Sequence, residues 1–380
     1  MADVVELARS IAEEVLAPNA ASWDAEARWP EEGVRAMQAR GLAGLVVPSR
    51  FGGLDGKLSA LVRVCEQLGK ADASSAICFG MHCVATACID AKATRDQAER
   101  FLRPIAAGQH WTTLALSESG TGSHFYFPSA TATLQDDGYS LAGRKSFVTN
   151  GGHADSYVTS VADPRAELGH FSLLVVDSET LDDRWLEPWN GWGMRANSSR
   201  GVDLDALRVP REALLGEEGD QIWYVFHVVA PYFLVAMAGT YLGVAAHAFE
   251  EARAHLLRRA HSHTGVPLAE VSILQHRLGQ LWTALQRTRQ LCHWAADEAD
   301  RGGPEALPGL CAAKADVGTM VVDLVNECMT LVGGRGYEAA SSLHRLLRDA
   351  RAAHVMSPTT DLLHTWTGRA LLGLPLLGES

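Results

Sequence analysis

Two turns rich in small residues have the composition of a ligand cradle. The first reads SESGTGS over residues 117–123 and follows the apolar run LAL at residues 114–116, and the second reads VTNGG over residues 148–152. Glycines let the backbone approach a flat or anionic ligand closely, and the neighbouring hydroxyl and free N–H groups can hydrogen-bond it. Each turn alone is more often a plain turn of a β domain. Two of them on one β framework predict a cofactor cradle.

A third glycine-rich turn lies near the other end of the chain. It reads LVGGRGY over residues 331–337 and is followed by the charged segment LRDAR at residues 347–351. Considered alone, glycines after an apolar run are the usual stop of a helix and imply no ligand. This turn gains a functional meaning only in combination with the first two.

The secondary structure expected around these turns changes twice along the chain, from helices to strands and back to helices. Residues 1–110 read as helices with short breaks, residues 111–215 as short strands, and residues 216–380 as long helices. We therefore expect an α+β protein with an N-terminal helical domain, a middle antiparallel β sandwich or barrel and a C-terminal four-helix bundle. The predicted strands are 111–117, 131–135, 139–145, 156–160, 171–176 and 202–209.

One predicted C-terminal helix is unusually apolar. Residues 223–244 resemble a membrane span in composition, but Asp220, His227, Pro231 and the acidic cluster from Glu250 favour a helix buried in a bundle. Residues 271–299, 311–331 and 341–355 supply three further predicted helices. A chain of 380 residues is long enough for such subdomains to bury a large core.

Charge and cysteine content restrict the partners of this protein. The net charge of −12 argues against nucleic acid and against an anionic membrane surface. The first residues read as an amphipathic helix with acidic side chains, which is not the pattern of a signal peptide. Seven scattered cysteines without a CxxC pair predict reduced, buried thiols, a cytoplasmic location and no metal site.

The three turns together resemble the acyl-CoA dehydrogenase superfamily, and the resemblance spans essentially the whole chain. Residues 117–124 match the family's [TS]-E-x-G-x-G-S-D turn, and residues 147–151 match its W-x-T-N-G turn. Residues 333–351 contain the counterparts of its GGxGY and R-D-A-R segments. The match has two departures in the β turns, because His124 replaces the usual aspartate and Phe147 replaces the usual tryptophan.

The resemblance implies a flavin-dependent oxidoreductase that acts on an acyl-CoA or carrier-bound thioester, with FAD, or alternatively FMN, as its cofactor. It also implies a homo-oligomer, a dimer or tetramer, because the family completes each flavin site across two subunits. The substrate contacts that it implies are Ser123, His124 and Met356. The flavin contacts that it implies are Leu114, Leu116, Ser117, Gly122, Ser123, Phe147, Thr149, Arg259, His261, Gly333, Gly334, Thr359 and Asp361.

The catalytic base of the family has no counterpart in this sequence. The family carries it as a glutamate in the segment I-Y-E-G-T-x-E-I, and the ungapped match, residues 354–362, has Ser357 at the glutamate position and Pro358 after it. A serine hydroxyl has no accessible basic form near neutral pH unless another group activates it. Residues 230–235, which match the helix where other members carry the base, contain no carboxylate.

A further departure concerns the cofactor phosphates. The family's R-x-x-F-G segment, which reaches the FAD pyrophosphate across the dimer, aligns with the sequence HSHTG at residues 261–265. Arg258 and Arg259 lie just upstream and can supply the missing positive charge. FAD is still the favoured cofactor because both β turns are present.

Three functions fit this pattern. The first is dehydrogenation of a thioester without the standard base, either alone or coupled to oxygenation by O2. Its candidate catalytic residues are Ser357, His354 and Asp361, and His124 is another candidate base. The second is a reduced-flavin-dependent monooxygenase that hydroxylates a small organic substrate, because a sister branch of the fold also lacks the glutamate. The third is a non-catalytic subunit that completes the flavin site of a heteromeric enzyme.

Overall fold

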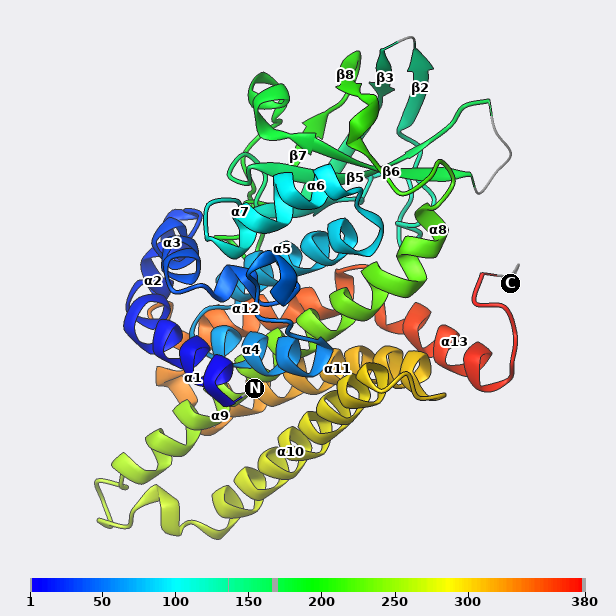
Figure 1. Cartoon of the computed structure of the whole chain (residues 1–380). Helices are drawn as coiled ribbons and strands as arrows, with labels where there is room; N and C mark the ends of the chain where they lie inside the picture. Colours follow the sequence, from blue (N-terminus) through cyan, green and yellow to red (C-terminus); the bar gives the residue numbers. More distant parts are fainter. Residues whose placement is uncertain (1, 136, 166–169, 378–380) are drawn as a thin grey trace.

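The computed structural model describes residues 2–135, 137–165 and 170–377, and its β region lies between two helical regions of the chain (Figure 1). In the N-terminal part, the two long helices α4 and α5 are joined at a sharp corner, where the Asp72 carboxylate accepts a hydrogen bond from the Ser75 N–H at 2.8 Å. This cap satisfies an otherwise free donor at the start of α5. The helices are α1 (Ala2–Ile11), α2 (Ala17–Glu26), α3 (Glu31–Ala39), α4 (Leu58–Ala71), α5 (Ala73–Lys92), α6 (Arg95–Gln97) and α7 (Arg103–Ala106).

The middle part folds into one mixed sheet and a separate two-stranded sheet. In the larger sheet the strand order is β8-β3-β2-β5-β6-β9, and β1 pairs with β5 off this path. The smaller sheet pairs β4 with β7. The strands are β1 (Thr112–Ala115), β2 (Thr131–Gln135), β3 (Gly138–Ala142), β4 (Arg144–Val148), β5 (Ser156–Ala162), β6 (Phe171–Asp177), β7 (Arg200–Asp203), β8 (Leu207–Pro210) and β9 (Leu214–Leu215).

Three details of the β prediction are corrected by the structure. The predicted strand 139–145 is interrupted at Gly143, which has a φ of 111° and separates β3 from β4. Most pairs are antiparallel, as predicted, but β1 runs parallel to β5, and β2 meets β5 in parallel at a single residue pair. The predicted strand 202–209 is two strands, β7 and β8. Between them Ala206 has a φ of 57°, and the Leu207 N–H donates to the Leu204 carbonyl at 3.0 Å. Alternating apolar residues do not reveal such a turn.

The C-terminal part is a bundle of long helices arranged around α9, which contacts α4, α5, α10, α11 and α12. Residues 225–229 join α8 to α9 in one continuous helical run. The helix α13 is absent from the sequence prediction because its sequence, TDLLHTWTGRAL, mixes apolar with threonine and histidine positions and has a weak period. The helices are α8 (Gln221–Tyr224), α9 (Ala230–Arg258), α10 (Ser272–Asp300), α11 (Ala306–Val332), α12 (Ser342–Val355) and α13 (Thr360–Leu371).

Glycines let α9 cross α4 at very short range. A Cβ added to Gly69 would lie 2.5 Å from the Thr240 carbonyl oxygen, and one added to Gly239 would lie 2.3 Å from the Val62 carbonyl oxygen. Neither position has room for a side chain, so the two glycines set the spacing of the helices.

Residues 73–92, 221–258 and 306–335 form helices that are long and apolar enough to cross a membrane by length and composition. In the second of them, 83% of the most apolar window is buried inside the protein, so its apolarity serves packing, as predicted. The seven cysteines are buried and free, as predicted.

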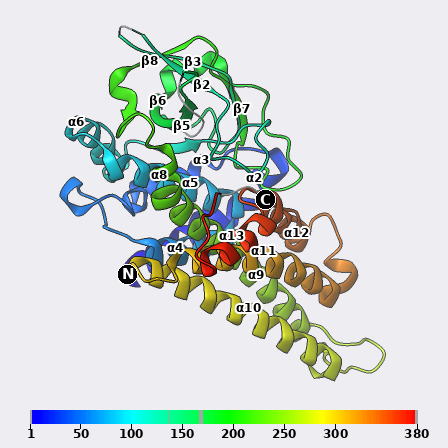
Figure 2. The same cartoon turned by 90° about the vertical axis from the view of Figure 1, so that its right-hand side faces the viewer.

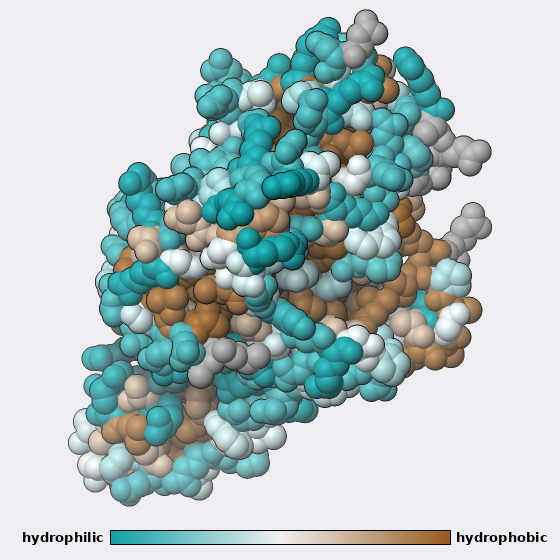
Figure 3. Space-filling model, in the orientation of Figure 1, coloured by the Kyte–Doolittle hydropathy of each residue, from teal (hydrophilic) through white to brown (hydrophobic). Residues whose placement is uncertain are grey.

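Figure 2 shows that the end of α9 and the start of α10 extend beyond the rest of the molecule as an arm. Figure 3 shows apolar surface over the end of α13, where Leu371 and Leu372 are exposed.

A buried arginine connects the three parts of the chain. Arg348 of α12 forms an ion pair with the Asp24 carboxylate of α2, in which the guanidinium donates to both carboxylate oxygens. The same guanidinium donates to the carbonyl of Trp192, in the loop before β7, at 2.8 Å. A bidentate pair of this kind fixes orientation as well as distance. The junction therefore holds N-terminal helix, β loop and C-terminal bundle in one arrangement.

Candidate functional site

A cavity of about 380 Å³ lies where the three parts of the chain meet. Its β side consists of the turn after β1, the end of β4 and the loop before β7, and its other side consists of α5, the start of α9 and the end of α12. The helical wall is apolar, being formed by Ile77, Met81, Val229, Phe233 and Met237. Polar groups therefore reach the cavity mainly from the β side, a distribution typical of sites that orient a mostly apolar ligand.

The first glycine-rich turn, which the sequence predicts to hold a cofactor, lines this cavity. Gly122 has a φ of 55°, which favours glycine, and no atom lies within 4 Å of a Cβ built on Gly120 or Gly122. The open face of the turn therefore leaves its backbone free for a ligand. Of the residues predicted here, Leu114, Leu116, Ser117 and Gly122 line the cavity.

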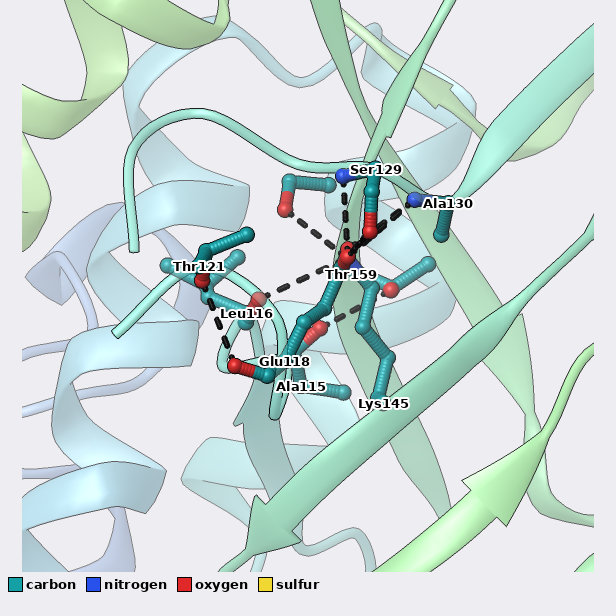
Figure 4. A network of polar contacts seen from close by, with 9 residues as sticks. Ala115, Leu116, Glu118, Thr121, Ser129, Ala130, Lys145 and Thr159 are labelled. Carbon is teal, nitrogen blue, oxygen red and sulfur yellow. Dashed lines mark hydrogen bonds and ion pairs between the residues drawn. The ribbon is translucent and has the colours of Figure 1, made fainter. Parts of the chain in front are cut away.

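Glu118 anchors this turn to neighbouring segments of the β region (Figure 4). Its carboxylate accepts hydrogen bonds from the Ser129 and Ala130 N–H groups, and it forms a fully buried ion pair with Lys145 at 2.6 Å. Lys145 also donates to the Ser160 hydroxyl at 3.2 Å. Burial alone would raise the pKa of Glu118, but Lys145 and Ser129 outweigh it and hold the pKa below its ordinary value. Glu118 is therefore an ionised structural group.

The second turn places an aromatic ring and a hydroxyl at the cavity. Phe147 and Thr149 both line it, and Phe147 is 59% exposed and has a φ of 56°. The Thr149 carbonyl accepts from the Thr113 hydroxyl at 2.9 Å, which ties the turn to β1. Asn150 donates to the Cys78 carbonyl of α5 at 3.0 Å. These bonds hold the second turn against both the sheet and the N-terminal helices.

The loop before β7 contributes residues that the sequence prediction missed. Trp189, Asn197 and Ser199 line the cavity. The Trp189 ring meets the Phe147 ring edge-on, with centroids 6.2 Å apart, and its indole N–H donates to the Met194 carbonyl at 3.0 Å. The signal that could have found this loop is its sequence WNGWG, in which aromatic residues alternate with glycines.

Asn197 carries a buried donor without a partner at the cavity wall. Its side-chain oxygen accepts from the Ser199 N–H at 3.1 Å, so its amide nitrogen faces the other way, and there it has no hydrogen-bond partner among the described residues. Close by, the hydroxyls of Thr149 and Ser199 lie 3.4 Å apart. An unpaired buried donor beside hydroxyls and an open glycine backbone fits a flat ligand with polar edges, such as a flavin ring.

The end of α12 closes the cavity on the side where the family base would lie. Met356 and Ser357, predicted as a substrate contact and a catalytic residue, both line the cavity. The Ser357 hydroxyl donates to the Ser123 carbonyl at 2.8 Å and so links the C-terminal bundle to the first β turn. Ser123, predicted to contact both flavin and substrate, is not part of the cavity lining, although it follows Gly122, which is.

His354 and Asp361, the other predicted catalytic residues, lie in a separate depression. It is lined by these two residues together with Arg351, Thr359 and Thr360. Burial lowers the pKa of His354, and its ring nitrogen lies 3.3 Å from the Thr360 hydroxyl. The structure therefore does not bring His354 and Asp361 together with Ser357 in one cavity.

The remaining predicted residues lie outside the cavity wall. The His124 ring hydrogen-bonds the Tyr126 hydroxyl at 2.7 Å. Arg259 and His261 are exposed on the arm, and Gly333 and Gly334 are exposed at the end of α11. Their role in contacting a flavin across two subunits stays a prediction.

The cavity offers no free base. Among the described residues that line it, Glu118 is the only carboxylate, and its oxygens are already engaged by Lys145 and by backbone N–H groups. No histidine or lysine is part of this lining. Proton abstraction by a side chain would need such a group within hydrogen-bond reach of the substrate.

Comparison with known proteins identifies the class. Three family models match: the acyl-CoA dehydrogenase N-terminal domain over residues 2–109, the middle domain over residues 113–207 and the C-terminal domain over residues 233–372. The chain belongs to the acyl-CoA dehydrogenase family, whose fold it has. The predicted class, a flavin-dependent oxidoreductase of the dehydrogenase type with FAD as its cofactor, is thereby confirmed.

Its relatives include enzymes with different thioester substrates. The chain is 26% identical to the short-chain-specific acyl-CoA dehydrogenase of Clostridium acetobutylicum, with 94% of each chain covered. It is 27% identical to the cyclohex-1-ene-1-carbonyl-CoA dehydrogenase of Geobacter metallireducens, with 97% of each covered. The structure of butyryl-CoA dehydrogenase from Megasphaera elsdenii superposes with a TM-score of 0.91 at 25% identity, with 97% of each chain covered.

Proposed function

We propose that this enzyme dehydrogenates a thioester whose acyl group is already conjugated, without a carboxylate base. The cavity carries the proposal: its helical wall is apolar and its only described carboxylate, Glu118, is paired with Lys145. A saturated acyl chain is a weak carbon acid and needs a strong, well-placed base. Conjugation acidifies the carbon acid, so that stabilising the enolate oxygen is enough.

The conjugated class is also supported by a relative. The Geobacter metallireducens enzyme is named for a thioester that already contains a double bond next to its carbonyl. The apolar wall of Ile77, Phe233 and Met237 suits a compact hydrocarbon acyl group. Either coenzyme A or a carrier protein can present such a thioester, and both stay within the proposal.

The backbone N–H of Ser357 is the proposed donor to the thioester carbonyl. Ser357 lines the cavity, while the carbonyl of the preceding residue, Met356, accepts from Lys314 at 3.1 Å on the other side. In a planar trans peptide the N–H points away from the C=O of the same unit. A preorganised backbone donor of this kind stabilises an oxyanion without moving during the reaction.

The flavin-binding residues are proposed on the β side of the cavity. Leu116, Ser117, Phe147 and Thr149 would hold the ring, with Asn197 supplying a hydrogen bond to its polar edge. When bound, FAD supplies a hydride acceptor for the acyl group. The proton of the acidified carbon leaves to water, so that the acyl group gains one double bond and loses one hydride and one proton.

The proposal is tested by anaerobic mixing of the purified yellow protein with two thioesters. Cyclohex-1-ene-1-carbonyl-CoA should bleach the visible flavin absorption, whereas butyryl-CoA should bleach it far more slowly. Equal bleaching by both would show that an unrecognised base is present. If the flavin stays bound and is bleached neither by these thioesters nor by the same acyl groups on a carrier protein, the dehydrogenase proposal is overturned.

A second candidate, a reduced-flavin-dependent monooxygenase, is favoured by the unpaired donor of Asn197 and the hydroxyls of Thr149 and Ser199 at the wall. Hydroxylation places one atom of O2 in the substrate and releases the other as water, with two electrons from the reduced flavin. Mixing the reduced protein and substrate with ¹⁸O2 distinguishes the candidates, because only the oxygenase incorporates the label. The alternative of a non-catalytic subunit gains no support, because both β turns and the cavity are in place.

We further propose a homo-oligomer. Four predicted flavin contacts are exposed and do not line this chain's own cavity, so they would reach the flavin of a second subunit: Arg259, His261, Gly333 and Gly334. Light scattering of the purified protein tests it, and a monomer that retains FAD would contradict it. The cytoplasmic location and the domain limits at residues 110 and 215 stay predictions.

A further inference from the structure

A buried lysine of α11 holds the turn that forms the C-terminal wall of the cavity. Lys314 is fully buried, and its ammonium donates to the carbonyls of Ala353 at 3.0 Å, Met356 at 3.1 Å and Pro358 at 2.8 Å. No carboxylate in the described part of the chain forms an ion pair with it. A buried cation without a counterion is costly, so the three carbonyls replace its hydration shell.

The ammonium form persists at neutral pH. Burial lowers the pKa of Lys314 to about 8, which is still above the pH of a neutral solution. All three acceptors lie within six residues that begin in the last turn of α12 and end just before α13. The Lys314 ammonium therefore hydrogen-bonds the free carbonyls at the end of α12 and in the turn after it.

This arrangement dictates where the amide of Ser357 points. The C=O of Met356 faces Lys314, so the N–H of the same peptide unit, which belongs to Ser357, faces away from it. Ser357 lines the cavity and Lys314 does not. The Ser357 hydroxyl is separately held by the Ser123 carbonyl at 2.8 Å, so the residue is fixed on two sides.

We propose that Lys314 is a positioning residue for the reaction, which orients and polarises the Met356–Ser357 peptide so that its N–H binds the thioester carbonyl. A positive charge on the carbonyl side draws electron density from the amide and strengthens the N–H as a donor. Such a preorganised donor stabilises the negative charge that develops on the enolate oxygen. The inference rests on the proposed thioester substrate, but the positioning of the turn is testable without it.

The test compares Lys314→Met, which removes the donors, with Lys314→Arg, which keeps the charge. Leu324→Ala is the matched control, because Leu324 is a buried residue of the same helix ten positions further on, roughly 15 Å away. Amide hydrogen exchange of residues 353–362 should accelerate in Lys314→Met and stay as in the wild type in Leu324→Ala and Lys314→Arg. Equal exchange in all four proteins would overturn the positioning role.

The second measurement isolates the carbonyl. Butyryl-CoA and its thioether analogue S-butyl-CoA differ only in the thioester oxygen. The affinity for butyryl-CoA divided by the affinity for S-butyl-CoA therefore measures how strongly the Ser357 N–H binds that oxygen. Lys314→Met should lower the ratio by about two- to tenfold. Lys314→Arg should restore most of it, and Leu324→Ala should keep it although its melting temperature falls.

The outcomes separate the inference from the proposed function. An unchanged ratio in Lys314→Met overturns the polarising role. Binding of neither ligand to the wild type would refute a coenzyme A thioester as the substrate, and the exchange data alone would then decide the positioning role. If Lys314→Met does not fold, Lys314→Gln retains a neutral donor of similar reach, and a ratio equal to that of the wild type in this variant would show that the charge is not needed.

Discussion

The Ser357 side chain is engaged within the protein, which leaves the backbone N–H of this residue for the proposed substrate contact. Its hydroxyl is used in a hydrogen bond to the Ser123 carbonyl at 2.8 Å, so it joins the bundle to the β turn. A hydroxyl engaged in this way cannot collect a proton from a substrate, because no base is arranged to relay it. Under the proposed function, the residue at this position determines which carbon acids the enzyme can oxidise.

Replacing Ser357 by glutamate should create the missing base. The change Ser357→Glu is expected to raise the desaturation of butyryl-CoA roughly 100-fold, since a positioned general base contributes about 10²–10⁴ in rate. The measurement is the anaerobic rate of flavin bleaching. Ser357→Gln has the same size without a basic form and should show no gain. A glutamate variant that binds flavin and shows no gain would contradict this account of the cavity.

Trp189 should contribute to flavin affinity. It lines the cavity beside Phe147, and aromatic contacts add about 0.5–1.5 kcal/mol beyond buried area. Trp189→Phe is therefore expected to weaken FAD binding by about tenfold or less, as measured by titrating the apoprotein with FAD. Trp192→Phe is the control, because Trp192 is 63% exposed and not part of the cavity lining. Equal losses in both variants would refute the contact.

At the scale of single residues, the sequence predicted some of the residues that line the cavity and missed others. Phe147 and Gly122 were predicted because they lie in turns that match a known pattern, and both line the cavity. Trp189 and Asn197 were missed because their place depends on how a loop packs. A Cβ on Gly193 would lie 2.3 Å from the Arg348 carbonyl oxygen, so close packing on α12 sets the loop, and no local pattern encodes that contact.

Helix α12 carries a second buried charge, Asp349. Its carboxylate accepts from the Met194 N–H at 2.7 Å, and burial raises its pKa from 3.8 to about 7, although Arg345 opposes the rise. A carboxyl whose pKa is higher in the folded than in the unfolded chain binds more protons when folded. Stability therefore falls as the pH rises through the interval between the two values.

The change Asp349→Asn should remove this pH dependence. The amide oxygen can still accept from Met194, and the group no longer ionises. Relative to the variant, the wild type is expected to lose about 2 kcal/mol of stability between about pH 5 and about pH 8. Urea unfolding at the two pH values measures it. Parallel losses in both proteins would show that Asp349 is not the titrating group.

Long elements were easier to predict than short ones. The helices α9, α10 and α11 were predicted because an apolar period continues over many turns. The helix α13 and the turn at Ala206 were not, because a weak period and a single left-handed residue leave little trace in the sequence. The separate depression of His354 and Asp361 was also unforeseen, since residues a few positions apart across a helix end can face opposite ways.

For the whole molecule, the junction at Arg348 should matter more than any surface pair. Arg348→Met leaves the partly buried carboxylate of Asp24 without its partner. Breaking a fully buried pair typically costs about 3–5 kcal/mol, so we expect a loss near the lower end of that range. Urea unfolding should show this loss. Arg35→Met breaks the exposed pair with Glu31 and should change stability by less than about 0.5 kcal/mol. Similar effects of the two substitutions would mean that the junction does not hold the three parts together.

The overall architecture was predictable because three turns and two changes of period agree with one family, whose models match all three parts of the chain. The chemistry was less predictable, because the place of the base is empty of carboxylates in sequence and structure alike. What replaces it depends on distances between α11, α12 and the β turns, which come from packing.

The crossing of α4 and α9 has a consequence for how the protein is made. Gly69 of α4 meets Thr240 of α9, so the face of α4 that packs on α9 stays uncovered until the β region and α9 have left the ribosome. During most of its synthesis the chain therefore exposes apolar surface that only a late segment can cover. Such a delay invites aggregation and slows assembly, and newly made chains should depend on molecular chaperones until α9 docks.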